Sequence, residues 1–258
     1  MTLFRPCIDL HQGRVKQIVG STLRDDGSTP QTNFVADQDA AWFATRYRED
    51  ELRGGHMILL GPGNEAAARS ALAAWPQGLQ LGGGVHPGNA DAWLAAGAHK
   101  LIVTSWLFED GALSFERVAR LSAQIGREQL VIDLSCRRVG ADWCVATDRW
   151  QTLTKTRIER STLEALAEHC SELLVHAADV EGKSAGIDEA LVARLGELSP
   201  LPTTYAGGGR ALDDLGRVEA LSEGRVDLTF GSALDLFGGR GVRYIDCVAW
   251  NRQHRSVS

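Results

Sequence analysis

The sequence predicts a single closed (β/α)₈ TIM barrel whose two halves are related by a pseudo-twofold axis. Eight short apolar runs alternate with eight amphipathic helical patterns, which is typical of parallel strands joined by crossover helices. The length of 258 residues suits eight strand–helix units, whereas an open doubly wound sheet of this size usually has fewer strands. Motifs at the strand ends also recur after about half the chain. We expect one domain over residues 1–258, with half-barrels of about 1–126 and 127–258.

The predicted strands are short and mainly apolar, as expected for parallel strands covered on both faces. They span residues 4–9, 56–60, 78–81, 100–104, 130–133, 173–176, 203–206 and 226–230. The predicted helices have apolar residues at helical spacing. They span residues 37–51, 65–75, 89–96, 114–125, 161–170, 187–195, 211–221 and 242–250.

Two connections are longer than is usual in a compact domain, and such loops are often lids or binding loops. Residues 20–34 are polar and rich in turn formers, so we expect this loop to move. The second connection follows Asp133 and contains residues 145–151, whose mixed apolar and polar side chains suggest a small hairpin.

Three features of the first half return in the second, in the same order and about half a chain later. They are Asp9 and Asp133, the glycine triplets at 82–84 and 207–209, and Ser105 and Ser232. All of them fall at the ends of equivalent predicted strands, which favours an internal repeat over coincidence.

The composition is that of an ordinary soluble globular protein. The sequence has no long uncharged apolar run and no signal-peptide pattern, so we expect a cytoplasmic protein that does not contact membranes. The net charge of −6 argues against a general nucleic-acid surface. The five cysteines have neither disulfide-framework nor metal-ligand spacing, so we predict no metal site.

Asp9 and Asp133 end the first and fifth predicted strands, which lie on opposite sides of an eight-stranded ring. Active sites of such barrels form at the carboxyl ends of the strands, so the two carboxylates should face one another across the mouth. That geometry suits an acid and a base acting on opposite faces of a small substrate. The alternative is that each aspartate only caps a loop or pairs with a nearby arginine.

The two glycine triplets follow the third and seventh strands, where glycine lets backbone N–H groups approach an anion closely. Loops after strands seven and eight form the recurring phosphate site of this fold, here helped by a short helix such as 233–236. One triplet alone is more often a plain turn, but the duplication predicts a ligand with a phosphate at each end. The residues expected to bind it are Gly83, Gly84, Thr104, Ser105, Gly207, Gly208, Gly231 and Ser232.

Seven blocks carry a resemblance to a known family, and each lies at a predicted strand end. The blocks span residues 7–20, 81–85, 103–107, 131–137, 176–182, 205–209 and 227–232. They resemble the phosphoribosylformimino-aminoimidazole-carboxamide ribotide isomerases of histidine biosynthesis, in particular the divergent form typical of eukaryotes. The resemblance covers nearly the whole chain.

The resemblance implies an Amadori rearrangement of an aminoaldose to an aminoketose without a cofactor. It assigns the general base to Asp9, and Asp133 matches an aspartate near the reacting sugar. Glu181, followed by Gly182, matches the position of the family's acid, an aspartate in other members; Asp179 and His176 remain alternatives for that role.

The resemblance also assigns an aromatic contact and contains departures. Trp150 matches a tryptophan that stacks on the substrate base, although packing of its own hairpin is the alternative. His176 should point toward the mouth as a substrate contact or a hydrogen-bonding residue. The second strand ends in residues 59–62 without the acidic residue common in bacterial members, and Gln17 stands where many relatives carry Arg or Lys.

Two other functions remain alternatives. The cyclase subunit of imidazole glycerol phosphate synthase has the same half-barrel symmetry, but its pattern carries a lysine where this chain has Gln17. A non-catalytic barrel that only binds phosphorylated ligands would gain nothing from central carboxylates. We expect a monomer whose partner is a small bisphosphate; acceptance of phosphoribosylanthranilate is left open.

Overall fold

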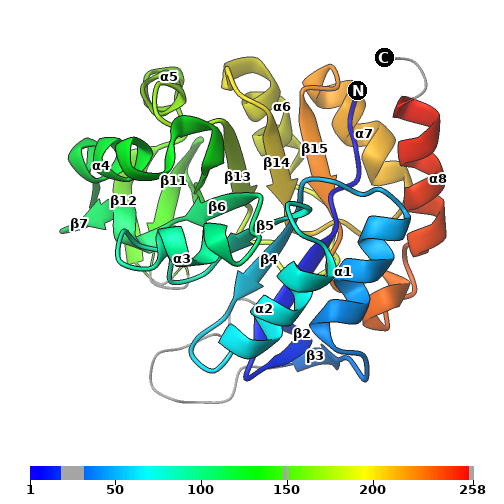
Figure 1. Ribbon diagram of the computed structural model, residues 1–258. Helices are drawn as coiled ribbons and strands as arrows, with labels where there is room; N and C mark the ends of the chain where they lie inside the picture. Colours follow the sequence, from blue (N-terminus) through cyan, green and yellow to red (C-terminus); the bar gives the residue numbers. More distant parts are fainter. Residues whose placement is uncertain (19–31, 148–149, 151, 256–258) are drawn as a thin grey trace.

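The computed structural model describes residues 1–18, 32–147, 150 and 152–255. Within these residues, eight parallel strands curl into the inner wall of a barrel (Figure 1). In spatial order they are β1 (Cys7–His11), β4 (Gly55–Leu59), β5 (Leu79–Gly82), β6 (Lys100–Val103), β9 (Leu130–Asp133), β13 (Glu172–His176), β14 (Thr203–Ala206) and β15 (Val226–Thr229). Each parallel pair keeps one register throughout, for example Asp9 opposite Ile58 and Tyr205 opposite Leu228.

The sheet closes between β15 and the residues that precede β1. Phe4 forms a parallel bridge with Leu228. The Arg5 amide donates to the Leu228 carbonyl at 2.9 Å, and the Leu228 amide donates to the Leu3 carbonyl at 3.0 Å. The fold is therefore a (β/α)₈ barrel, as the alternating sequence pattern predicts.

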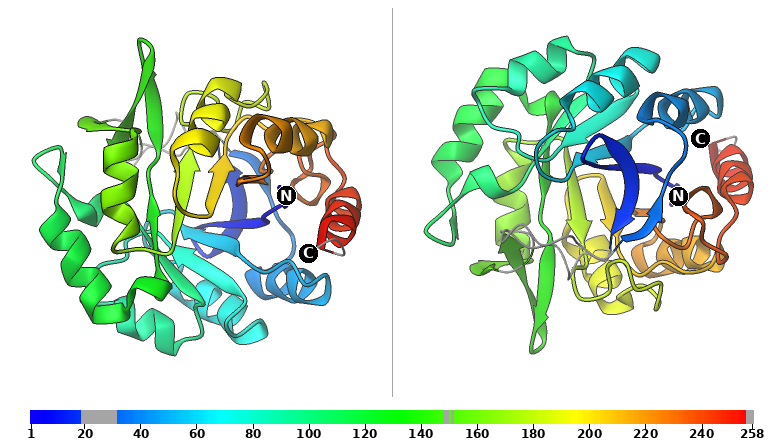
Figure 2. Two further views of the ribbon diagram at one scale, coloured as in Figure 1. Left: turned by 90° about the horizontal axis from the view of Figure 1, so that it is seen from above. Right: turned by 90° about the horizontal axis from the view of Figure 1, so that it is seen from below.

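A ring of helices covers the outside of the strands, and both views along the barrel show it (Figure 2). The helices are α1 (Ala40–Glu49), α2 (Glu65–Ala74), α3 (Ala90–Ala95), α4 (Phe115–Ile125), α5 (Arg160–Ala167), α6 (Glu189–Leu198), α7 (Asp213–Ser222) and α8 (Tyr244–Arg255). Side-chain caps set where several of them begin. Asp39 accepts from the Trp42 amide at 2.8 Å, so α1 starts at Ala40 and not at the expected residue 37.

The two long connections contain more structure than the sequence suggests. β1 continues into an antiparallel pair, β2 (Arg14–Ile18) and β3 (Thr32–Val35), at the carboxyl ends of the barrel strands (Figure 2, right). Most of the predicted loop 20–34 lies outside the described residues. In place of a small hairpin, β10 (Cys136–Val139), β11 (Asp142–Thr147) and β12 (Thr152–Arg157) form a three-stranded antiparallel sheet.

Two smaller elements also differ from expectation. β7 (Phe108–Glu109) and β8 (Ala112–Leu113) form a short antiparallel pair before α4. The short helix predicted at 233–236 is a 3₁₀ turn, η4 (Asp235–Phe237). It ends at Gly238, whose φ of +73° stops the helix.

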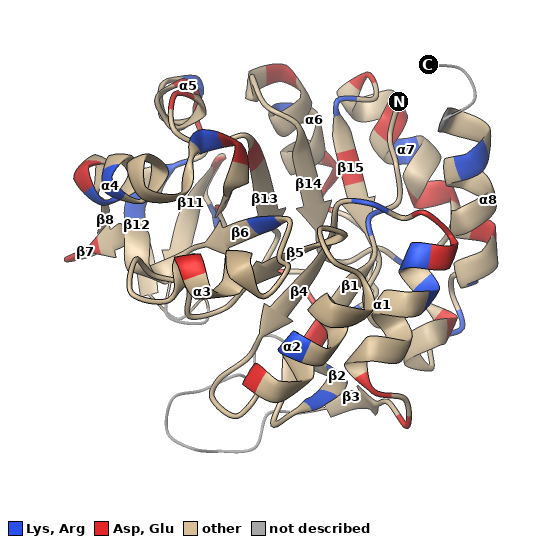
Figure 3. Ribbon diagram, viewed as in Figure 1, with Lys and Arg blue, Asp and Glu red and all other residues tan. Residues whose placement is uncertain are grey.

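The core has two layers. Side chains between the strands and the helices form the larger one, which includes Phe43, Tyr47 and Leu81. Inside the barrel, one aliphatic side chain from each of four strands forms a separate small layer: Ile58, Ile102, Val131 and Leu174. Charged residues colour mainly the helices and loops in Figure 3, and the strands are mostly uncharged. No helix among the described residues is long and apolar enough to cross a membrane.

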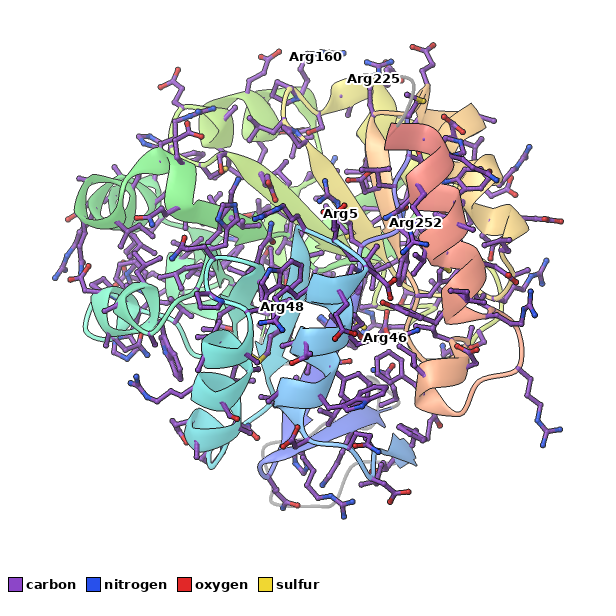
Figure 4. All side chains as sticks on the ribbon, turned by 45° about the vertical axis from the view of Figure 1, so that its right-hand side comes forward. Arg5, Arg46, Arg48, Arg160, Arg225 and Arg252 are labelled. Carbon is purple, nitrogen blue, oxygen red and sulfur yellow. The ribbon has the colours of Figure 1, made fainter. Side chains whose placement is uncertain are left out.

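Ion pairs hold α1 against α8 near the line where the barrel closes. Asp50, which follows α1 and is 11% exposed, accepts from the Tyr244 hydroxyl at 2.8 Å and from Arg252 at 3.0 Å. Arg46 lies 3.4 Å from the same carboxylate. Figure 4 labels Arg46 and Arg252 on this side of the molecule, with Arg5 nearby at the start of the chain.

Candidate active site

A cavity of about 400 Å³ opens at the carboxyl ends of the strands. Its lining contains nine residues that the sequence analysis singled out: Asp9, Gly83, Gly84, Thr104, Ser105, Asp133, Trp150, His176 and Glu181. This cavity reaches from the centre of the mouth to the loops after β5 and β6.

A second, smaller cavity of about 30 Å³ lies next to it. It reaches the loops after β14 and β15, and its lining contains the remaining singled-out residues: Gly182, Gly207, Gly208, Gly231 and Ser232. Asp9, His176 and Glu181 line both cavities. These three side chains therefore mark the centre of the site, with one glycine-rich end on each side.

Asp133 anchors a hydrogen-bonded group on one side of the centre. Its Oδ1 accepts from Ser135 Oγ at 2.9 Å and lies 3.3 Å from His176 Nδ1; its Oδ2 accepts from Thr104 Oγ1 at 3.3 Å. Burial alone would lower the pKa of His176, but Asp133, with help from Glu181 and Asp9, raises it to about 9. His176 therefore carries a positive charge at neutral pH.

Asp9 and Glu181 are two carboxyl groups whose protonation depends on one another. Burial, followed by the charge of Glu181, raises the pKa of Asp9 to about 7, while His176 and Gln17 oppose the rise. Burial also raises the pKa of Glu181, and His176 again opposes it. Two such groups can divide the roles of base and acid near neutral pH.

Glu181 reaches the centre because Gly207 leaves room for its side chain. A Cβ atom on Gly207 would lie 3.2 Å from Glu181 Oε2, which is tighter than most contacts of a Cβ atom. Asp179, the alternative acid, is exposed and lies outside both cavity linings. It accepts from Arg137 Nε at 3.0 Å and from the Arg138 amide at 2.8 Å.

The glycine-rich ends require glycine for steric reasons. Gly83 has a φ of +95°, and a Cβ atom there would lie 2.2 Å from the Leu59 carbonyl oxygen. Gly208 has a φ of +74°, and a Cβ atom there would lie 2.1 Å from the Gly186 carbonyl oxygen. At the second end, the hydroxyls of Ser184 and Ser232 are 3.2 Å apart.

Trp150 lies at the mouth of the larger cavity, half-buried, with a positive φ of 66°. Its ring centroid is 6.1 Å from that of His176, and the two planes are inclined by 39°. An aromatic face is therefore available beside the charged centre.

Several lining residues were not identified from the sequence as parts of the site. Ser135 and Thr147 line the large cavity, and His56 and Gln17 line the small one. Burial, together with the charge of His176, lowers the pKa of His56 to about 3, so its imidazole is neutral. For Gln17 the sequence offers a signal, because a residue two positions after the apolar Val15 lies on the same face of a strand, and the structure shows that this face of β2 is buried.

The fold and site define a (β/α)₈-barrel enzyme with paired carboxyl groups at the centre of a two-ended cavity. The chain belongs to the histidine biosynthesis protein family, whose model matches residues 4–241.

Relatives support this assignment over nearly the whole chain. A Neurospora crassa protein is 55% identical over 98% of this chain and 100% of its own length. A Saccharomyces cerevisiae protein is 47% identical over 98% of this chain and 99% of its own length. Both are named 1-(5-phosphoribosyl)-5-((5-phosphoribosylamino)methylideneamino) imidazole-4-carboxamide isomerase. A Medicago truncatula relative with the same enzyme name, described as chloroplastic, is 50% identical over 98% of this chain and 82% of its own length.

Proposed function

We infer that this protein is the aldose–ketose isomerase of histidine biosynthesis, which converts the aminoaldose ribotide to the aminoketose by an Amadori rearrangement. The observation that carries the inference is the position of Asp9 and Glu181 where the two cavities meet. The enzyme name carried by relatives of about 50% identity supports the same reaction.

The chemistry requires proton transfers at the ring oxygen, at C1′ and C2′, and at the 2′-hydroxyl. A protonated Glu181 gives its proton to the ring oxygen as the bond from C1′ to that oxygen breaks, which opens the ring and leaves an iminium at C1′. Asp9 then takes the proton from C2′ to give the enolamine. The enolamine becomes the ketone as the protonated Asp9 returns its proton to C1′ and the 2′-hydroxyl gives its proton to the ionised Glu181, which restores both carboxyl groups. A base is most effective when its pKa is close to the working pH, and the pKa of Asp9, raised by burial to about 7, meets this condition.

His176 supplies positive charge to the centre without being the acid. Its interaction with Asp133 keeps it protonated, and its charge lowers the pKa values of both Asp9 and Glu181. It thereby helps the carboxyl groups to give up their protons after each transfer.

The two glycine-rich ends are proposed to bind the two phosphates of the substrate. Gly83, Gly84, Thr104 and Ser105 line one end, and Gly207, Gly208, Gly231 and Ser232 line the other. Binding at both ends would hold C2′ within reach of the base. Part of the binding energy is then used to orient the reacting groups. Trp150 is proposed to stack on the imidazole base.

The cyclase alternative gains no support, because the relatives named above carry the isomerase name. We also propose that the protein acts as a monomer in the cytoplasm, with the half-barrels 1–126 and 127–258 as units of one domain. Light scattering of the purified protein tests the monomer.

The function is tested by expressing the chain in a histidine auxotroph that lacks the isomerase. Growth without histidine is expected. Purified protein should also change the ultraviolet absorbance of the aminoaldose ribotide when a cyclase and ammonia are supplied to consume the product. A well-expressed protein that fails in both assays would instead favour the non-catalytic barrel.

A further inference from the structure

Gln17 is a buried amide that no step of the proposed reaction uses. It lies on β2, where Val15 and Gln17 point inward, and its exposed fraction is 4%. Its Nε2 donates to Asp9 Oδ2 at 2.9 Å. This contact links the hairpin that follows β1 directly to the proposed base.

The carbonyl end of the Gln17 amide is also held in place. A Cβ atom on Gly231 would lie 2.7 Å from Gln17 Oε1, so the carbonyl end rests against the loop after β15. The buried Cys7 thiol, whose pKa burial raises and Gln17 lowers, donates to the Phe230 carbonyl oxygen at 3.6 Å. Reversing the amide would turn its carbonyl oxygen toward the Asp9 carboxylate, so the carboxylate determines which end faces it.

We propose that Gln17 is a positioning residue for the base: it occupies Oδ2 of Asp9 and thereby leaves Oδ1 to take the substrate proton. The proposal rests on the proposed isomerase function. An uncharged donor suits this position, because it orients the carboxylate while leaving it basic. An ammonium group at the same place would hold the carboxylate ionised and weaken it as a base.

Most of the titratable groups that interact with Asp9 disfavour its ionised form. Beyond the effect of burial, Glu181, on the loop after β13, raises the pKa of Asp9, and Asp9 in turn raises the pKa of the Cys7 thiol on β1 and of the Tyr47 phenol on α1. His176 is the one group with a positive charge among those that shift the pKa of Asp9 in the described part of the chain. Burial and Glu181 raise that pKa, and Gln17 acts with His176 in the opposite direction.

The test is the pH profile of kcat/KM for two variants and one control. Gln17→Met keeps a linear side chain of similar length but removes the donor. The midpoint of the acid limb of its pH profile, where activity rises as the base ionises, should move to higher pH by about one unit. Because the pKa of Asp9 is about 7 in the wild type, kcat/KM at pH 7 should then fall roughly fivefold. Gln17→Lys should move the acid limb to lower pH by about one unit or more. Lys16→Met, on the other face of β2, should keep the wild-type midpoint.

Wild-type midpoints in both Gln17 variants would overturn the proposal, whether or not kcat/KM falls equally at every pH. The melting temperature of each variant shows whether such an equal loss comes from a damaged fold. The titration of the Asp9 carboxyl carbon by ¹³C NMR gives a readout that needs no substrate. Inactive wild-type protein would contradict the proposed function, whereas an unchanged Asp9 titration in both variants would contradict only the role of Gln17.

Discussion

Asp9 combines burial with a neighbouring carboxyl group, and both raise its pKa to about 7. Replacing it with asparagine keeps the shape and removes the basic oxygen. Asp9→Asn should lower kcat by roughly 10²- to 10⁴-fold, the usual contribution of general base catalysis, and leave substrate binding nearly unchanged. Steady-state kinetics and calorimetric titration of the substrate measure the two effects. A variant with wild-type kcat would remove Asp9 from the mechanism.

Glu181 and Asp179 lie in one segment but in different surroundings. Glu181 lines both cavities, whereas Asp179 is exposed and pairs with Arg137. Glu181→Gln should therefore lower kcat by roughly 10²-fold or more, because it removes the proposed acid. Asp179→Asn serves as the matched control and should retain activity close to the wild type in the same assay. The opposite ranking would assign the acid to Asp179.

The His176–Asp133 pair should make stability depend on pH. The pKa of His176 is about 9 in the folded protein and about 6.5 when unfolded, so the folded state holds the proton more tightly. The stabilisation is complete below pH 6.5 and is lost as the pH rises through 9. We expect the free energy of unfolding to fall by up to about 3 kcal/mol between pH 7 and pH 9.5.

Urea unfolding at several pH values checks this prediction. The decrease should be much smaller in Asp133→Asn, because that change removes the main partner that raises the pKa. If the free energy of unfolding fell equally with pH in the wild type and in Asp133→Asn, the prediction would be contradicted. Asp9 also loses stabilisation with rising pH, but its window extends from about pH 4 to pH 7 and lies lower.

Single residues of the site were predictable where they follow an apolar run in the carboxyl-terminal part of a barrel strand. Asp133 ends β9 and β1 continues for two residues past Asp9, but the fold class directs both residues to the mouth. The contacts between His176 and Asp133 and between Gln17 and Asp9 were not predictable. They depend on which rotamer each side chain adopts among neighbours from distant parts of the chain.

At the scale of elements, the barrel strands were predicted well because each is a compact apolar run. β9 and β14 have the predicted bounds, and the other barrel strands differ from them by one to three residues at an end. β2, β3, β10 and β12 were missed because at least half of their residues are polar. β2 and β3 extend the barrel sheet past β1, and β10 and β12 belong to the separate three-stranded sheet. Hydrophobic periodicity is weak in such strands.

The contact between α1 and α8 gives a prediction at this scale. Asp50→Ala leaves the Tyr244 hydroxyl without its acceptor and removes the carboxylate that two partly exposed arginines share. We expect a loss of about 1–3 kcal/mol in the free energy of unfolding, mainly from the unpaired hydroxyl. Urea unfolding provides the measurement, with Asp246→Ala as the control because its partner Arg243 is largely exposed. Equal losses in the free energy of unfolding would show that the α1–α8 contact stabilises the fold no more than the exposed pair does.

At the scale of the whole molecule, the barrel is closed by contacts between the first residues of the chain and its last strand and helix. These contacts are here called the seam. Asp227 of β15 accepts from the Leu3 amide at 2.8 Å and from Arg5 Nε at 2.6 Å. Thr2 and Phe4 add hydrogen bonds to Val226 and Asn251. The last barrel strand and the last helix therefore both hold the first residues of the chain.

Asp227→Asn should weaken this seam, because it removes the charge that Arg5 pairs with at a site where both side chains are mostly buried. We expect faster amide hydrogen exchange at residues 3–5 and at Leu228 together, although these positions are far apart in sequence. Glu223→Gln, which alters an exposed pair with Arg225, is the control. Faster exchange at residues 3–5 alone, or at Leu228 alone, would show that the two sides of the seam do not open together.

The seam also has a consequence for synthesis on the ribosome. Thr2 and its partner Val226 are 224 positions apart, so the first strand is made long before the strand that completes the ring. At usual rates of translation the interval is roughly 10–45 s. During that time residues 3–5, which precede β1, lack the backbone partners that β15 provides, and exposed strand edges are sites of aggregation. A nascent chain of this kind is therefore one that chaperones should bind until β15 has emerged.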